Sequence, residues 1–170
     1  MSINEWSDAT AMTEAVQNKT VSPLELVEAT IRETERTNSR INAIVSQRYE
    51  KALKEAETRD FSDKPFAGVP IFLKDLGQEQ AGEPSTAGSR LFTSFHATET
   101  DNYVKKLEEL GFIILGCSST PEFGFKNISD AQIHGPVNLP DDVTRNAGGS
   151  SGGAAALVSS GISPLAPASD

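Results

Sequence analysis

The stretch Val69-Pro-Ile-Phe-Leu-Lys-Asp75 decides the fold, because an apolar run ends there directly in a lysine and an aspartate. Pro65 and Gly68 precede this run, and a short apolar run bounded by such turn residues predicts a buried strand. Residues 112–115 form a second apolar run after Gly111 and predict another buried strand. The two runs together indicate an α/β sheet with parallel elements.

Helical patterns lie between and before these strands. Residues 100–110 separate the two strands and place Val104 and Leu107 on one side of a helix. Closer to the N-terminus, Ser22-Pro-Leu-Glu25 has serine at the N-cap, proline at the first helical position and glutamate at the third. This capping-box pattern predicts the start of a helix, which we expect to end at Asn38.

These elements predict two regions. A short extended piece at 41–45 and a polar helix near 47–59 complete an N-terminal helical segment, residues 1–60. Residues 61–170 then form the N-terminal portion of an α/β domain. The expected fold class is therefore α/β, with N-terminal helices followed by part of a mixed, mostly parallel sheet flanked by helices.

Composition argues against several classes of function. The 24 acidic and 15 basic residues give a formal net charge of −9, which repels nucleic-acid phosphates and anionic membranes. No apolar run approaches the ~18 residues of a membrane span, and the N-terminus lacks a basic region followed by an apolar stretch. We therefore expect a cytoplasmic protein that binds neither nucleic acid nor membrane.

The cysteine and histidine content gives no indication of a metal or a cofactor. Cys117 is the only cysteine, so an internal disulfide and a thiolate zinc cluster are both excluded within the chain. Its position at the end of an apolar run predicts a small buried side chain. His96 and His134 are isolated in sequence, so we expect no metal site.

A glycine-serine loop, Gly148-Gly-Ser-Ser-Gly-Gly153, opens an alanine-rich helix at residues 154–158. A phosphate cradle is one interpretation, but the Walker pattern requires Gly-Lys-Ser/Thr at the end of its loop. A flexible linker is another, but linkers are seldom followed at once by a small-residue helix. The third interpretation is a catalytic loop that presents a hydroxyl group.

A hydroxyl needs a proton acceptor before it can act as a nucleophile or a relay. Neither histidine has local support for a Ser-His-Asp triad, which leaves Lys74 as the better candidate. A lysine at the end of an apolar strand can simply extend its amine to solvent. If the amine is buried instead, desolvation favours its neutral form, which is the form that a general base requires.

Several segments together resemble the amidase signature family, and the resemblance covers the chain in the right order. Asn138-Leu-Pro140 departs from the family pattern, in which asparagine directly precedes proline. The matching segments are Gly68-Val-Pro-Ile-Phe-Leu-Lys-Asp75, Ser85-Thr-Ala-Gly-Ser89, Ser118-Ser-Thr-Pro-Glu-Phe-Gly124, Gly135-Pro-Val-Asn138 and Gly148-Gly-Ser-Ser-Gly-Gly153.

The resemblance implies a Ser-cisSer-Lys triad in which Lys74 is the lysine and Ser150 the cis-serine. The nucleophilic serine of the family belongs to an Asp-x-Gly-Gly-Ser segment, whose aspartate would match Asp170. We therefore expect the nucleophile and most of the oxyanion hole beyond this residue, and the chain itself to be an inactive N-terminal fragment. No metal and no cofactor are implied.

Other residues near these motifs receive lesser roles. Gly148, Gly149, Gly152, Ser151 and Asp170 are expected to shape the loop or bind substrate. For Ser151 we favour a hydroxyl that holds the loop or caps the following helix over one that takes part in catalysis. Asp75 is expected to orient Lys74 or the loop backbone, and Thr86 and Ser89 are candidates for lining the pocket.

Three functions remain open. The first is an amidase that hydrolyses the C–N bond of a small carboxylic amide through an acyl-enzyme, with a homo-oligomer possible. The second is the A subunit of a tRNA-dependent amidotransferase, which would need partner subunits. The third is a non-catalytic α/β binding module.

Overall fold

The structure is a computed structural model and describes residues 8–169, so Asp170 lies outside the described residues. Three strands and five α-helices form the frame, with short 3-10 turns at Arg90–Phe92 and Glu122–Gly124. In chain order the elements are α1 (Ala9–Gln17), α2 (Pro23–Ile41), β1 (Ile44–Gln47), α3 (Tyr49–Thr58), β2 (Pro70–Lys74), α4 (Asn102–Glu109), β3 (Ile113–Ser118) and α5 (Gly152–Ser159).

The strands form one mixed sheet in the order β1-β3-β2. β2 and β3 run parallel, so that Lys74 lies opposite Ser118 at the same end of both strands. β1 pairs antiparallel with the other side of β3. The expected mixed sheet is confirmed, and β1 provides its antiparallel member.

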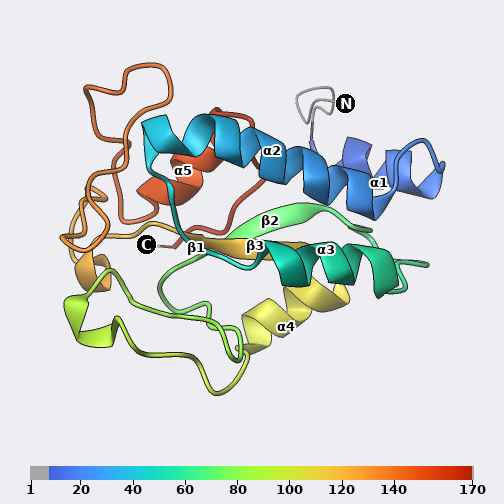
Figure 1. Cartoon of the computed structure of the whole chain (residues 1–170), viewed down its shortest axis with the longest axis horizontal. Coiled ribbons are helices and arrows are strands. Elements are labelled where there is room, and N and C mark those ends of the chain that lie inside the picture. The colour runs from blue at the N-terminus through green and yellow to red at the C-terminus, as the bar shows by residue number, and fades with distance from the viewer. Residues whose placement is uncertain (1–7, 170) are drawn as a thin grey trace.

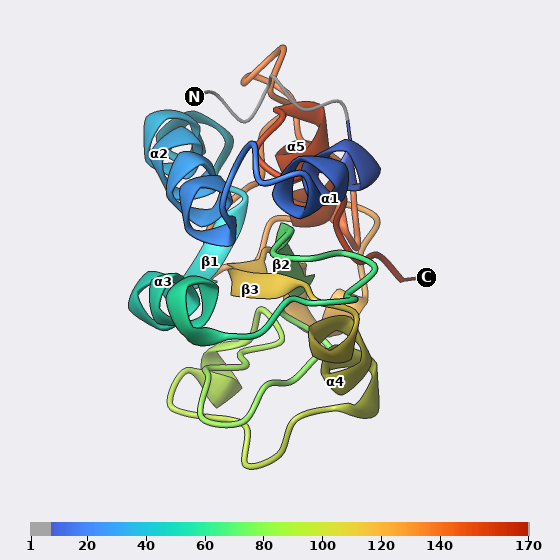
Figure 2. The same ribbon diagram turned by 90° about the vertical axis from the view of Figure 1, so that its right-hand side faces the viewer.

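Helices cover both faces of this sheet (Figures 1 and 2). α2 and α5 lie over one face, α4 lies under the other, and α3 packs against α2 and β3. Every residue of β2 and β3 is consequently buried, as the two apolar runs predict. Alternate β2 residues enter two core clusters: Ile71 and Leu73 pack with α4, and Phe72 packs with α5.

The predicted start of α2 is confirmed, but the predicted end is three residues too early. Ser22 Oγ accepts a hydrogen bond from the Glu25 backbone N–H at 3.2 Å, and the Glu25 carboxylate accepts one from the Ser22 N–H at 2.8 Å. Instead of ending the helix, Asn38 lies in its last turn. Its side-chain oxygen accepts the N–H groups of Ala43 and Ile44 at 2.9 and 3.1 Å, beyond the helix end.

Two other boundaries shift. The extended piece expected at 41–45 is β1 at 44–47, and the helix expected from residue 47 begins at Tyr49. The shift follows from the pairing with β3, in which Gln47 lies opposite Gly116. The division at residue 60 stays a prediction, and β1 brings part of the first region into the same sheet as the second.

Candidate active site

Lys74 ends β2 with its side chain inside the protein, since only 1% of the residue is exposed. Its Nζ donates hydrogen bonds to Ser150 Oγ at 2.8 Å and to Ser151 Oγ at 3.0 Å. A third hydroxyl, Ser169 Oγ, also lies 3.0 Å from Nζ. The structure therefore brings the predicted lysine and both serines of the glycine-serine loop together, although 76 residues separate Lys74 from Ser150.

Ser151 is the N-cap residue of α5, but its hydroxyl makes no capping hydrogen bond. The expected helix cap is therefore wrong. The hydroxyl instead donates to the Ser169 carbonyl at 3.3 Å and accepts from the Ser169 N–H at 3.2 Å. Ser151 thus holds the backbone of a later segment beside Lys74, as a loop-holding role requires.

The glycines of the loop allow α5 to begin directly against its neighbours. The Gly149–Ser150 peptide bond is cis, and Gly148 has a φ of +84°, in the region that favours glycine. A Cβ on Gly152 would lie 2.6 Å from Ser129 Oγ. A Cβ on Gly153 would lie 2.4 Å from the backbone nitrogen of Ser119, just past the end of β3.

Replacing Gly153 should therefore destabilise the site. We expect Gly153→Ala to lower the free energy of unfolding by ~1–3 kcal/mol, because backbone atoms cannot move aside cheaply. Chemical denaturation measures this change, and Ser159→Ala on the exposed end of α5 is the matched control. Equal stability of Gly153→Ala and the control would show that the contact between α5 and β3 is looser than the structure indicates.

Asp75 holds the loop after β2. Its carboxylate accepts a hydrogen bond from the Thr86 N–H at 2.8 Å and another from the Thr86 hydroxyl. The Gly88 N–H adds a weaker contact at 3.4 Å. Of the two roles expected for Asp75, the contacts favour orientation of the loop backbone. Thr86 faces this carboxylate, while Ser89 Oγ donates to Glu122 Oε1 at 2.6 Å.

His134 joins this cluster, a contact that the sequence does not predict because the partners of His134 are distant in the chain. Its Nε2 lies 3.1 Å from Thr86 Oγ1 and 3.9 Å from Asp75 Oδ2. Burial lowers the pKa of His134, and the nearby Asp75 charge opposes this shift only in part. The neutral imidazole is therefore the form that the folded chain favours.

This burial predicts a dependence of stability on pH. The unfolded chain takes up a proton on His134 near its ordinary pKa of 6.5, whereas the folded chain does so only at lower pH. The stability contributed by neutral His134 is present above that value and is lost as the pH falls below it. We expect the stability difference between wild type and His134→Gln, measured by thermal unfolding, to decrease as the pH is lowered below 6.5. A difference that does not change with pH would contradict the assignment.

An open hollow of about 710 Å³ lies beside the two serines. Gly148, Gly149, Ser150, Ser151 and Gly152 all line it, and the role of the glycines and Ser151 in binding substrate stays a prediction. Neither Thr86 nor Ser89 lines this hollow, so the expectation for them is not met there. The remaining lining residues are small, apolar or uncharged: Asn127, Ala147, Ala154, Ala155, Val158, Ala166, Ala168 and Ser169.

Cys117 has no part in this arrangement. It is buried in β3, and desolvation raises its pKa to about 12, so its thiol stays protonated. Within residues 8–169, no group of three or more His, Cys, Asp or Glu side chains is placed to hold a metal ion. The arrangement can instead move protons between a buried amine and hydroxyl groups beside an open, uncharged hollow.

A family model described as Amidase matches residues 25–170. The chain belongs to the amidase family. Lipoamidase of Enterococcus faecalis is 40% identical over 98% of this chain and 23% of that protein. The 6-aminohexanoate-cyclic-dimer hydrolase of Paenarthrobacter ureafaciens is 35% identical over 99% of this chain and 34% of that protein.

Solved amidase structures have a matching fold. A bacterial aryl acylamidase of the amidase signature family has a TM-score of 0.87 and 35% identity, over 95% of this chain and 35% of that one. The resemblance found in the motifs is thereby confirmed, as is the fold class. The chain spans about a quarter to a third of the length of these amidase relatives. Among the helices of residues 8–169, none has the length and apolar character to cross a membrane.

Proposed function

We propose that this chain is the N-terminal part of an amidase that hydrolyses the C–N bond of a small carboxylic amide through a serine acyl-enzyme. The observation that carries this proposal is the contact of buried Lys74 Nζ with Ser150 Oγ at 2.8 Å. A buried amine beside a hydroxyl in an open hollow matches what general-base catalysis by lysine requires. Family membership supports the same chemistry.

In the proposed mechanism the neutral amine of Lys74 takes a proton from Ser150, which takes one from the nucleophilic serine expected beyond Asp170. That serine attacks the amide carbonyl, and the proton returns by the same route to the leaving amine. Water then attacks the acyl carbon and loses a proton to the relay. The bond from this carbon to the serine oxygen breaks, the relay returns the proton to that oxygen, and the carboxylic acid leaves. Backbone N–H groups near the nucleophile would hold the oxyanion of both tetrahedral intermediates.

The substrate is proposed from the lining of the hollow. Ala154, Ala155 and Val158 line its wall, and among residues 8–169 none of the lining residues carries a charge. Such a wall suits an uncharged acyl group and would leave a charged one unpaired. Relatives named lipoamidase and 6-aminohexanoate-cyclic-dimer hydrolase give a precedent in the family for amide substrates. A cytoplasmic location and a homo-oligomer belong to the same proposal.

The two alternative functions predict different behaviour. An amidotransferase subunit would hydrolyse amides efficiently only with its partner subunits and tRNA present. A binding module would hold a ligand without hydrolysing it. The contact between Lys74 and the two serines favours hydrolysis, because a binding module has no need for a buried amine beside hydroxyl groups.

A fluorophosphonate that labels activated serines tests the proposal. We expect intact-mass spectrometry to show no adduct on the 170-residue chain, and one adduct beyond Asp170 on a longer protein that begins with it. An adduct on Ser150 or Ser151 would place the nucleophile in this chain and overturn the proposed relay. A longer protein with neither an adduct nor amide hydrolysis would overturn the amidase function.

A further inference from the structure

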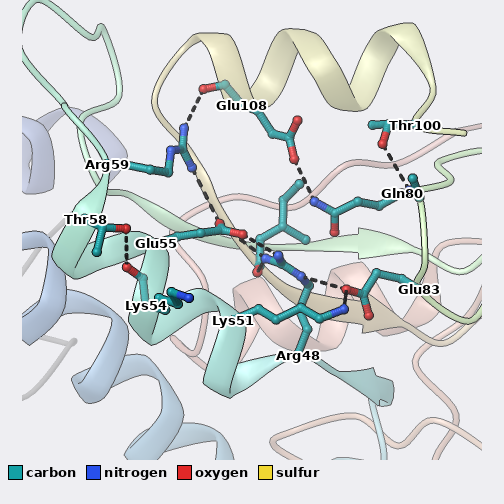
Figure 3. Close-up of polar contacts among 12 residues, drawn as sticks. Arg48, Lys51, Lys54, Glu55, Thr58, Arg59, Gln80, Glu83, Thr100 and Glu108 are labelled. Atoms are coloured by element: carbon teal, nitrogen blue, oxygen red, sulfur yellow. Dashed lines mark hydrogen bonds and ion pairs between the residues drawn. The ribbon is translucent and has the colours of Figure 1, made fainter.

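Arg48 is a buried cation that the proposed mechanism does not use. It follows β1 directly, and only 6% of its side chain is exposed. Its Nη1 donates to the Ile114 carbonyl of β3 at 2.6 Å, which fixes the guanidinium against the sheet. Glu55 of α3 and Glu83 of the loop after β2 supply carboxylates on either side of it (Figure 3).

Glu83 connects this cation to the loop. Its Oε1 lies 3.3 Å from Arg48 Nε and 2.6 Å from Lys51 Nζ, and 15% of its side chain is exposed. Its backbone carbonyl accepts the Ala97 N–H at 3.0 Å, next to the isolated antiparallel bridge between Pro84 and His96. Figure 3 shows Glu83 reaching from this loop toward α3.

The same loop holds the end of β2 at two points. Gln78 Oε1 accepts the backbone N–H of Lys74 at 2.8 Å. The Thr86 N–H donates to the Asp75 carboxylate at 2.8 Å. Glu83 lies between these two points in sequence, so its position affects both contacts.

A small enclosed cavity lies between the ion pair and the end of β2. Arg48, Glu83, Gln78, Lys74 and Asp75 all line it, between the sheet and the loop. Both members of the ion pair and the candidate catalytic lysine thus border the same cavity.

Electrostatics keep Arg48 charged. Burial acts to lower the pKa of Arg48, but the hydrogen bond and charge of Glu55, followed by those of Glu83, outweigh it and leave the pKa raised. A buried ion pair is often no more stabilising than apolar side chains of the same volume, so stability alone explains it poorly. Its geometry, in contrast, fixes where the loop lies relative to β3.

We propose that Arg48 and Glu83 are positioning residues whose ion pair holds loop 78–86 against β3 and thereby fixes Lys74 and Asp75 at the end of β2. The structural part of the proposal stands by itself. Its catalytic consequence rests on the proposed function, in which Lys74 is the general base.

Hydrogen exchange of the 170-residue chain tests the structural part without any assay of activity. In Glu83→Ala we expect the amides of Lys74 and Thr86 to exchange at least about tenfold faster, because the loop that protects them is released. Glu55→Ala is the matched control, since it also removes a carboxylate from Arg48 but does so on α3. In that variant both amides should keep their wild-type rates within about twofold.

Two outcomes would overturn the proposal. One is unchanged exchange of both amides in Glu83→Ala, and the other is equal acceleration in Glu55→Ala, which would indicate a general loss of stability. Glu83→Gln provides a milder variant, because its amide oxygen can still accept from Arg48 and Lys51. If Glu83→Ala does not fold, Glu83→Gln is compared with Glu55→Gln instead. Loss of the carboxylate charge weakens the contact with Arg48, so both amides should exchange faster in Glu83→Gln than in Glu55→Gln, by less than in Glu83→Ala. Equal rates in the two glutamine variants would overturn the proposal.

Activity of the longer protein tests the catalytic part. We expect Glu83→Ala to lower kcat about tenfold with KM within about twofold, because a displaced base affects the chemical step more than binding. Glu83→Gln should restore most of kcat. Equal kcat in Glu83→Ala and wild type, with altered exchange, would overturn the catalytic role alone. Absence of hydrolysis in the wild type would count against the amidase function and leave the exchange result valid.

Discussion

Lys74→Ala should lower kcat by about 10³-fold in a longer protein that begins with this chain, because no other described group could replace the amine beside Ser150 as the proton acceptor. Lys74→Met should have the same effect, since methionine fills a similar space without an amine. Steady-state kinetics on an amide substrate measure the loss. Circular dichroism should show that both variants remain folded.

A matched control separates this effect from a general change of charge. Lys106 lies on the outer side of α4, with 66% of its side chain exposed and an ion pair with Glu109. Lys106→Ala should keep kcat within about twofold, because exposed ion pairs contribute little. Wild-type turnover in Lys74→Met would rule out Lys74 as the base.

Ser150→Ala should lower kcat on the order of 10²-fold or more, because it removes the hydroxyl that relays the proton. Ser151→Ala should lower it by no more than about tenfold, the equivalent of one lost hydrogen bond. The two serines are a close comparison, since their hydroxyl groups lie 2.8 and 3.0 Å from the same amine. The ratio of the two kcat values is the quantity to measure.

The opposite order of effects would contradict the roles assigned here. A larger loss in Ser151→Ala would make Ser151 the relay and Ser150 the residue that holds the loop. Equal losses would indicate that the two hydroxyl groups act as one unit, and the double variant would then lose no more than either single one.

Those parts of the fold that depend on local chemistry could be predicted from the sequence. β2 and β3 follow from their apolar runs, and the start of α2 follows from the capping box at Ser22. The end of α2 was missed because the Asn38 side chain bonds beyond the helix, and spacing alone does not reveal this. The start of α3 was missed because pairing of β1 with β3 overrides a polar helical pattern.

Prediction of the candidate site depended on a different kind of information. Nothing in the spacing of Lys74 and Ser150 indicates that they meet. The lack of support for either histidine points to Lys74 as the proton acceptor of the loop, and the resemblance to the amidase signature family selects Ser150 as its partner. The contacts of His134 with Thr86 and of Arg48 with Glu83 were not predicted, because each includes at least one residue outside the motifs. They join polar residues of different loops, which have no periodicity and therefore no signal in one sequence.

The long separation between Lys74 and its hydroxyl partners has a consequence for the order of folding. Ser150 and Ser169 follow Lys74 by 76 and 95 residues, so these contacts close large loops and should form after the local helices. On the ribosome, α1 to β3 emerge before α5, and during that interval the amine of Lys74 has none of these hydroxyl groups available. Docking of α5 would therefore bring the hydroxyl groups of Ser150 and Ser151 to the buried amine in one late step.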